Sequence, residues 1–211
     1  MVTPTGAMAE ERPQRGRAGA IQIVIVALSS AIYAVLGIAG ATFTVAPGGI
    51  VIFYLPAIFI YPAAIWFGAW GVLGAFFGTL LFSPFFGYGF ALGLSFAVVD
   101  MISPTTVGLA QRALRVNPAV VTTRRDFILF AVAVIVGAAI EAVIGNGVLL
   151  VFGLTSVGGL PFSTFVWWTG EVTAGVILSP ILLRVLTPQF KRMGLFHQSF
   201  FGTQRGARII G

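Results

Sequence analysis

The sequence predicts an all-α integral membrane protein built as a single bundle of six transmembrane helices. Hydrophobic residues make up 58% of the chain and charged residues only 9%, with a mean hydropathy of +1.01, a composition outside the range of soluble domains. Apolar runs long enough to cross a bilayer recur from about residue 20 to residue 186. These runs are continuous rather than alternating, which excludes the strands of a membrane β-barrel.

The distribution of basic residues predicts the topology. Every Lys and Arg except Arg184 lies in the N-terminal lead, in the loop after the fourth span or in the C-terminal tail. Arg184 is placed at the inner end of the sixth span, where its long side chain reaches the same side. Six spans put all these segments on one side, so both termini are expected in the cytoplasm of a multi-pass plasma membrane protein. The net charge of +6 then reflects topology and contact with anionic lipids, and nucleic acid is not expected as a partner.

Three regions follow from this topology. Residues 1–19 are rich in small, Pro, Gly and charged residues and are expected to form a disordered cytoplasmic lead. Residues 20–186 form the transmembrane domain, and residues 187–211 form a basic cytoplasmic tail. The first span, Ala20–Phe43, is too long for the core of a signal peptide and should remain as a helix.

Small residues recur every four positions on the first span. Ala27 pairs in this way with Ala31, and Ser30 with Ala34. Such a face is shallow enough for another helix to approach closely. The approaching helix can belong to this bundle or to a partner subunit, and the sequence leaves both interpretations open.

The later spans are separated by turns rich in Gly and Pro. The second span is expected at Ile50–Trp66, short and kinked by Pro56 and Pro62. Glycines between residues 68 and 78 accompany the turn into the third span, which ends near residues 83–89. The remaining spans are expected at Phe90–Leu109, Phe127–Phe152 and Phe162–Leu186.

Three acidic residues fall inside the last three spans. Asp100, Glu141 and Glu171 all lie near the bilayer midplane, roughly 15 Å below the outer surface, and Asn146 lies nearer the outside. No Lys, Arg or His lies at that depth. A charge at the centre of a bilayer costs roughly 2.5–3.5 kcal/mol or more, so such residues are rarely kept for packing alone.

These acids suggest a substrate-binding cavity in the outer half of the membrane, walled by spans four to six. Trp167 and Trp168 would stack on a flat ring or a cation, and Glu171 or Glu141 would accept hydrogen bonds. Without a buried cation in the protein, a cationic or neutral ligand fits better than an anion. The alternative is structural: the acids carry protons and bond to Ser, Thr or backbone of neighbouring helices.

Several functional classes are excluded or disfavoured. The chain has no cysteine, which excludes disulfides and thiolate chemistry, and its one histidine, His197, lies beyond the last span. No catalytic motif such as HExxH is present, so neither an enzyme nor a resident metal or cofactor is expected. The phosphate-binding motif GxxxxGK[ST] is also missing, so any ATP hydrolysis must occur in a partner.

Two segments resemble the substrate-binding S components of energy-coupling factor (ECF) transporters. Residues 23–37 (IVIVALSSAIYAVLG) resemble their opening helix, whose small residues dock the coupling subunit. Residues 62–78 resemble their turn between helices two and three, with Ala69 and Trp70 where a proline is more usual. The resemblance implies uptake of a vitamin-like substrate. It also implies a docking face on this helix, formed by Ala27, Ala31, Ser30 and Ala34, for a coupling membrane subunit driven by two ABC-type ATPases.

The last span also resembles a second family. Residues 167–183 (WWTGEVTAGVILSPILL) are similar to the final helix of the MASE1 membrane sensor domain, in which a WW-x-G-acid pattern precedes small residues and a proline. The matching positions here are Trp167, Trp168, Gly170, Glu171 and Pro180. MASE1 domains normally have more spans and lead into a signalling output domain, whereas 25 residues follow the sixth span here. The resemblance implies a stand-alone ligand sensor as the alternative to an uptake subunit.

Overall fold

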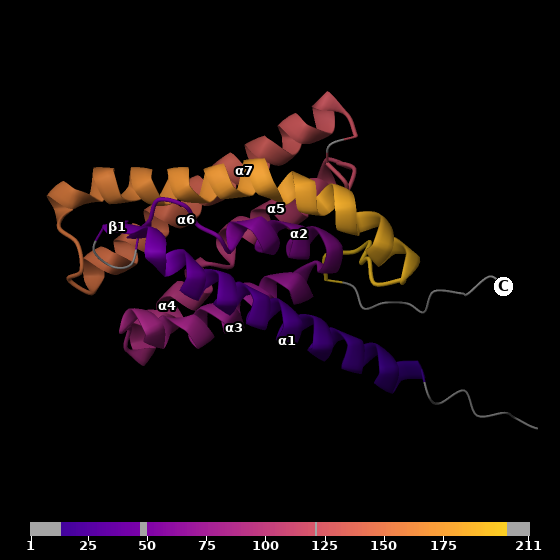
Figure 1. The fold of residues 1–211 in the computed structure, drawn as a ribbon, viewed down its shortest axis with the longest axis horizontal. Coiled ribbons are helices and arrows are strands. Elements are labelled where there is room, and N and C mark those ends of the chain that lie inside the picture. Colours follow the sequence, from indigo (N-terminus) through magenta and orange to yellow (C-terminus); the bar gives the residue numbers. More distant parts are fainter. Residues whose placement is uncertain (1–13, 47–49, 121, 202–211) are drawn as a thin grey trace, which may run out of the picture.

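The computed structural model describes residues 14–46, 50–120 and 122–201, which form one helical bundle (Figure 1). Five of its helical segments are long and apolar enough to cross a membrane, which confirms the predicted all-α membrane fold. The helices are α1 (Gln14–Gly40), α2 (Ala57–Phe67), α3 (Ala69–Phe82), α4 (Phe90–Val99), α5 (Ile102–Ala113), α6 (Arg124–Val151) and α7 (Leu160–Arg192). Two short antiparallel strands, β1 (Thr44–Ala46) and β2 (Ile50–Val51), follow α1.

The second pass through the bundle is only partly helical. The expected span at Ile50–Trp66 is wrong in its first half, because β2 occupies Ile50–Val51 and α2 begins only at Ala57, after Pro56. The N–H of Ile52 donates to the carbonyl of Phe43 at 3.0 Å, which holds the segment extended beside the end of α1. With 11 residues, α2 is about 16 Å long and crosses roughly half of the bilayer core.

The fourth pass is made of two helices. Helices α4 and α5 follow each other as one apolar segment, Phe90–Ala113, with a break at Asp100. The N–H of Asp100 still donates to the carbonyl of Phe96 at 2.8 Å, so the break is a bend rather than a loop. Residue Asp100 therefore sits at an interruption in the helix, where its carboxylate can turn into the bundle.

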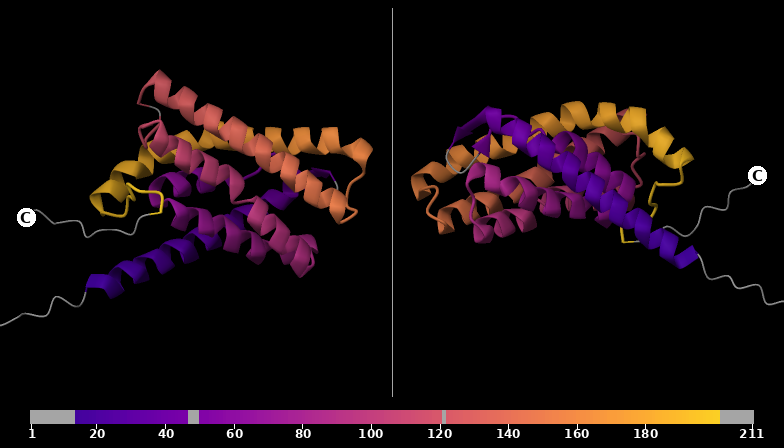
Figure 2. Two further views of the ribbon diagram at one scale, coloured as in Figure 1. Left: turned by 180° about the vertical axis from the view of Figure 1, so that it is seen from behind. Right: turned by 60° about the horizontal axis from the view of Figure 1, so that its bottom comes forward.

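Both described ends of the chain lie at the same end of the bundle. In Figures 1 and 2 the start of α1 (indigo) and the C-terminal segment (yellow) share this end, together with the α5–α6 connection, and the β1–β2 hairpin lies at the other. The predicted topology places both termini on one side of the membrane, and we call the shared end the inner end and the opposite end the outer end. Helix α1 takes in residues 14–19 of the expected lead, whose residues 1–13 lie outside the described residues.

The C-terminal tail does not begin where the sequence suggested. Helix α7 continues past the expected end at Leu186 to Arg192, with Pro188 inside it. The chain then turns at Gly194, and the segment up to Phe200 packs back onto the bundle. Residues 202–211 of the expected tail lie outside the described residues.

Helix α1 packs closely along α3, because glycines of α3 face it. A Cβ added at Gly78 would lie 2.7 Å from Cδ1 of Tyr33, and a Cβ at Gly74 would overlap Ser29. Only glycine at these two positions lets the helices approach to this distance without a shift.

This contact divides the small residues of the first span into two sets. Ser30 and Ala34 are buried, with 3% and 7% of their surface exposed, so they serve packing within the bundle. Ala27 and Ala31 are exposed. The expectation that all four form one docking face is therefore wrong for Ser30 and Ala34, because helical spacing alone does not say which face meets α3.

Candidate functional site

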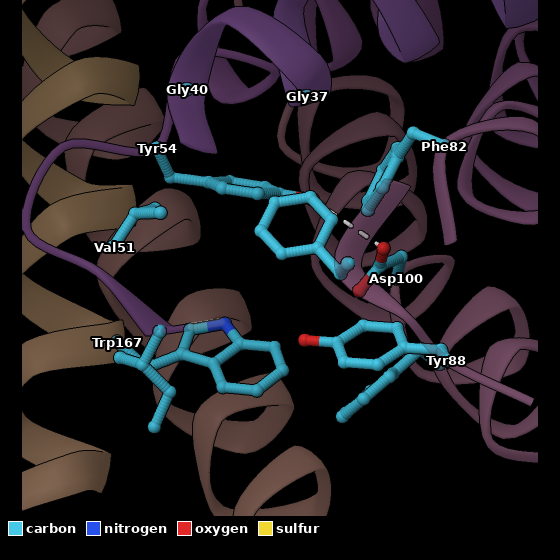
Figure 3. A pocket seen from close by; sticks show the side chains of 11 residues that line it. Gly37, Gly40, Val51, Tyr54, Phe82, Tyr88, Asp100 and Trp167 are labelled. Atoms are coloured by element: carbon cyan, nitrogen blue, oxygen red, sulfur yellow. Dashed lines mark hydrogen bonds between the residues drawn. The ribbon is translucent and has the colours of Figure 1, made fainter. Parts of the chain in front are cut away.

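A cavity of about 60 Å³ opens in the outer half of the bundle (Figure 3). It lies between the outer ends of α1, α3, α4 and α7 and the β2 segment, and one carboxylate, that of Asp100, is in its wall. The lining residues are Gly37, Gly40, Ile50, Val51, Tyr54, Phe82, Phe86, Tyr88, Phe96, Asp100 and Trp167.

The extended segment around β2 closes one side of this cavity because it packs directly on α7. The N–H of Tyr54 donates to the carbonyl of Gly170 at 3.2 Å. A Cβ at Gly170 would lie 2.7 Å from the carbonyl oxygen of Val51, so glycine is needed for this close approach. Trp167 precedes Gly170 by one helical turn, and its indole therefore enters the cavity beside the segment.

The carboxylate of Asp100 is 4% exposed and is held by hydroxyl groups from three other elements. Its Oδ2 accepts hydrogen bonds from Thr79 Oγ1 at 2.6 Å and from the Tyr33 hydroxyl at 3.0 Å. The Tyr54 hydroxyl lies 3.4 Å from the same oxygen and 2.5 Å from the Tyr33 hydroxyl, so its one proton is shared between these two acceptors. These are the bonds that the described residues make to this carboxylate, and Oδ1 accepts none of them. The arrangement fixes a buried acceptor at the cavity wall.

Aromatic rings surround the rest of the cavity. Trp167 and Tyr88 approach it from opposite sides, as Figure 3 shows. The ring of Phe96 lies between them, with its centroid 5.8 Å from that of Trp167 and 5.4 Å from that of Tyr88. The cavity therefore presents π faces next to a carboxylate, the pair of features that recognises organic cations.

A second group of buried polar side chains lies deeper and joins four helices. Oε1 of Glu171 on α7 accepts hydrogen bonds from the Tyr61 hydroxyl of α2 and the Ser103 hydroxyl of α5, both at 2.5 Å. The backbone N–H of Ser103 donates to Oε2 of Glu141 on α6 at 3.0 Å. Glu141 and Glu171 are each 1% exposed. Neither residue lines the cavity.

The two glutamates of this group lie close together. Both carboxyl groups bond to Ser103, which donates its N–H to Glu141 and its hydroxyl to Glu171. Oε2 of Glu171 is buried and receives no hydrogen bond from a donor among the described residues.

The other two predicted site residues point away from the cavity. Nδ2 of Asn146 donates to the carbonyl of Ala142 at 2.8 Å, a bond within α6. The indole N–H of Trp168 donates to the carbonyl of Ile135 at 3.1 Å. Both residues border a groove between α6 and α7 on the outside of the bundle. Trp168 thus joins α7 to α6, in a role the sequence did not suggest.

Of the six predicted site residues, the structure brings Asp100 and Trp167 to the cavity and gathers Glu141 and Glu171 in the deeper group. The expected wall of spans four to six is corrected: α1, α3 and β2 contribute, and α6 provides no lining residue. Helix α6 packs on α5 and α7 instead. The fold thus separates acids that residue counting places at similar depths.

The tyrosines of the chain are site residues that the sequence analysis missed, although their positions within the spans could have indicated them. The chain has four tyrosines, and all of them lie at the cavity or beside a buried acid. A tyrosine inside a span needs a partner for its hydroxyl, so tyrosines at the depth of intramembrane acids predict contact with them. They are Tyr33, Tyr54, Tyr61 and Tyr88.

Comparison with known proteins distinguishes between the two resemblances. No curated protein and no solved structure matches the chain significantly, and none of the comparisons supports an ECF S component. The sequence model of one family, MASE1, matches residues 25–205, which includes the whole cavity and the C-terminal segment that folds back. The chain is therefore a multi-pass membrane protein that belongs to the MASE1 family of membrane sensor domains.

Proposed function

We propose that this MASE1 domain senses a small organic cation, which binds in the outer-half cavity between Asp100 and Trp167. The observation that carries the proposal is the Asp100 carboxylate, buried at the wall of an aromatic cavity. Among the described residues, no Lys, Arg or His lines that cavity. Family membership favours sensing over uptake.

The chemistry of the wall favours a cation over a neutral ligand. Thr79 and Tyr33 already donate hydrogen bonds to Asp100, at 2.6 and 3.0 Å, so the carboxylate has less need of a neutral donor than of a positive charge. A carboxylate and a cation about 4 Å apart gain about 4 kcal/mol of electrostatic interaction energy at an effective dielectric constant of 20. The faces of Trp167 and Tyr88 add cation–π attraction, about 2 kcal/mol or more in a desolvated site.

The size of the cavity limits the ligand. Pockets for drug-sized molecules enclose about 300–1,000 Å³, whereas this cavity has a volume of about 60 Å³. A compact ammonium ion fits with a small rearrangement, and a ring-sized vitamin requires the outer ends of the helices to separate. In the proposed orientation in the plasma membrane, separation of these helix ends would open the cavity to the outside of the cell. The proposal involves binding only, with no chemical step.

Mass spectrometry of small molecules that copurify with the protein tests this function. Wild type, Asp100→Asn and Glu141→Gln are purified side by side. The Glu141 variant is the matched control, because it also converts a buried acid to its amide but lies outside the cavity. We expect one small cation to copurify with wild type and with the control, and to be lost from Asp100→Asn. Equal recovery from all three proteins would contradict the proposal.

A further inference from the structure

We propose that residues Leu195–Phe200, here called the C-terminal latch, carry the state of the cavity to the cytoplasmic side. The latch docks on the inner ends of α2 and α5, and its docking depends on the hydrogen bonds of Asp100 at their outer ends. This inference rests on the proposed sensing function and assigns its output. The MASE1 match extends over the whole latch.

The latch is bound by the turn between α2 and α3 through backbone hydrogen bonds. The N–H of His197 donates to the carbonyl of Trp66 at 2.7 Å, and the N–H of Ala69 donates to the carbonyl of Phe200 at 2.8 Å. Gly68 lies between these two positions with a φ of 60°, and any Cβ there would overlap the backbone of Phe200. The turn is thus shaped to receive the latch.

Arg112, near the end of α5, joins the latch to both helices. Its guanidinium donates to the carbonyls of Ala64 and Ile65 at 3.2 and 3.1 Å, in the last turn of α2. Carbonyls in the last turn of a helix attract a cation, which explains an arginine at this place, although the carbonyl of Ala64 also accepts the N–H of Gly68. The same guanidinium donates to the carbonyl of His197 at 3.0 Å. One side chain therefore contacts α2 and the latch together.

The ring of Phe200 completes the docking. It is buried, with 6% of its surface exposed, and packs against Ala64 and Val72. A Cβ at Gly108 of α5 would lie 2.7 Å from the ring, so this glycine leaves the space that the ring fills. The guanidinium carbon of Arg112 lies 5.4 Å from the centre of the same ring.

Helices α2 and α5 connect the cavity with the latch because they are joined at three levels. At the outer level, the Tyr54 hydroxyl before α2 lies 3.4 Å from Asp100 before α5 and is also joined to it through the Tyr33 hydroxyl, at 2.5 and 3.0 Å. In the middle, the hydroxyls of Tyr61 and Ser103 lie 2.6 Å apart. At the inner level, Arg112 bonds to the end of α2.

A cation bound at Asp100 competes with the Tyr54 hydroxyl for the carboxylate. Weakening this outer bond lets the two helices shift relative to each other, since packed helices move as rigid units. The shift displaces Arg112 from the carbonyls of α2. The latch then loses the side chain that holds it and dissociates from the turn.

Spin labels can measure latch docking directly, because the chain has no cysteine of its own. Ala113→Cys and Gln198→Cys place labels at two exposed positions, one at the end of α5 and one in the latch. Pulsed electron paramagnetic resonance then gives the distribution of distances between them. The full chain is used in lipid nanodiscs after washing removes bound small molecules. We expect one narrow distribution.

Two variants test the docking. Arg112→Gln should replace the narrow distribution by a broad, longer one, whereas Arg115→Gln, at an exposed arginine three residues later, should leave it unchanged. Phe200→Ala gives the same test if Arg112→Gln fails to fold. A narrow distribution that persists in the folded Arg112→Gln or Phe200→Ala protein would overturn the docking mechanism.

Two further variants test the connection to the cavity. Tyr54→Phe and Asp100→Asn should each lower the docked fraction, because each weakens the outer bond, whereas Ser95→Ala at a half-buried position of α4 should not. An unchanged docked fraction in both would overturn the connection. If Asp100→Asn has also lost its copurifying cation, the proposed binding site is retained and only the proposed latch mechanism is overturned. If that cation is retained, the proposed binding site itself is wrong.

Discussion

The hydroxyl of Tyr61 lies 2.5 Å from Oε1 of Glu171, and it joins two helices whose contact residues are 110 positions apart in the chain. Both side chains are almost fully buried. The bond involves α2, a helix of only 11 residues that lies between the cavity at one end and the latch at the other. A side chain in this place stabilises the packing of α2 against α7.

Removal of the Tyr61 hydroxyl should therefore destabilise the bundle. In Tyr61→Phe the ring remains, but Glu171 keeps only the Ser103 hydroxyl as a donor to Oε1, so we expect a loss of about 1–3 kcal/mol. Thermal unfolding in detergent measures the change. Ser95→Ala removes a hydroxyl of a half-buried residue whose exposed bond stays within its own helix, and it should change stability by less than about 0.5 kcal/mol. Equal stability of the two variants would argue against a structural role for Tyr61.

The contact between α1 and α3 should tolerate no added methyl group. Gly78→Ala places a Cβ 2.7 Å from the ring of Tyr33, and we expect a loss of about 1–3 kcal/mol from overpacking. Gly147→Ala on α6 is the control, because nothing lies within 4 Å of its added Cβ. That change should stabilise the helix by about 0.5–1 kcal/mol. We therefore expect the free energy of unfolding to fall in Gly78→Ala and to rise in Gly147→Ala when both are measured by thermal unfolding.

The two sets of small residues on α1 should respond differently to larger side chains. Ala27→Leu with Ala31→Leu should leave the isolated protein folded, because both positions are exposed. Ser30→Leu with Ala34→Leu should abolish folding, because both are buried in the bundle. Size-exclusion chromatography in detergent separates the outcomes. Aggregation of the first pair would mean that Ala27 and Ala31 are also packed.

Docking of the latch should weaken in acid. The His197 imidazole is buried and bonds through Nδ1 to the carbonyl of Leu195 at 3.0 Å, while Nε2 is buried and unpaired among the described residues. Burial lowers the pKa of His197 below its ordinary value of 6.5, and the charge of Arg112 lowers it further. The docked latch therefore resists protonation, whereas the released latch accepts a proton at its ordinary pKa.

The direction of the pH effect follows from this difference. Docking is at full strength above pH 6.5 and is lost progressively as the pH falls through 6.5 toward the lower pKa of the docked state. The distance distribution between labels at Ala113 and Gln198 should broaden between about pH 8 and pH 5.5. In His197→Gln it should stay constant over that range. A wild-type distribution that does not change with pH would show that His197 does not control docking.

Hydropathy and charge predicted most of the fold because the bilayer restricts spanning segments to long apolar helices. They could not predict the start of α2. Residues 50–55 are as apolar as a helix, and only the tertiary bonds of Ile52 to Phe43 and of Tyr54 to Gly170 keep them extended. The extension of α7 past Pro188 was missed for a similar reason, since proline marks a probable and not a certain boundary.

The sequence predicted how deep the site residues lie in the membrane, but not which face of each helix they occupy relative to the cavity. Residue counting placed Asp100, Glu141 and Glu171 at similar heights, yet only Asp100 lines the cavity. Which face of each span meets its neighbours depends on the crossing of the helices and on contacts such as Gly170 with β2, which a hydropathy pattern does not contain. Glu171, the residue that the sequence favoured most, instead binds Tyr61 and Ser103 in the deeper group.

The most direct test of the binding site is the thermal shift that the copurifying molecule produces when it is added back. A ligand at about 100 times its Kd stabilises a protein by about 2.7 kcal/mol. We predict that wild type and Glu171→Gln, whose side chain lies outside the cavity, show the full shift, that Trp167→Phe shows a reduced one and that Asp100→Asn shows none. A full shift in Asp100→Asn would contradict the assignment of this cavity as the sensing site.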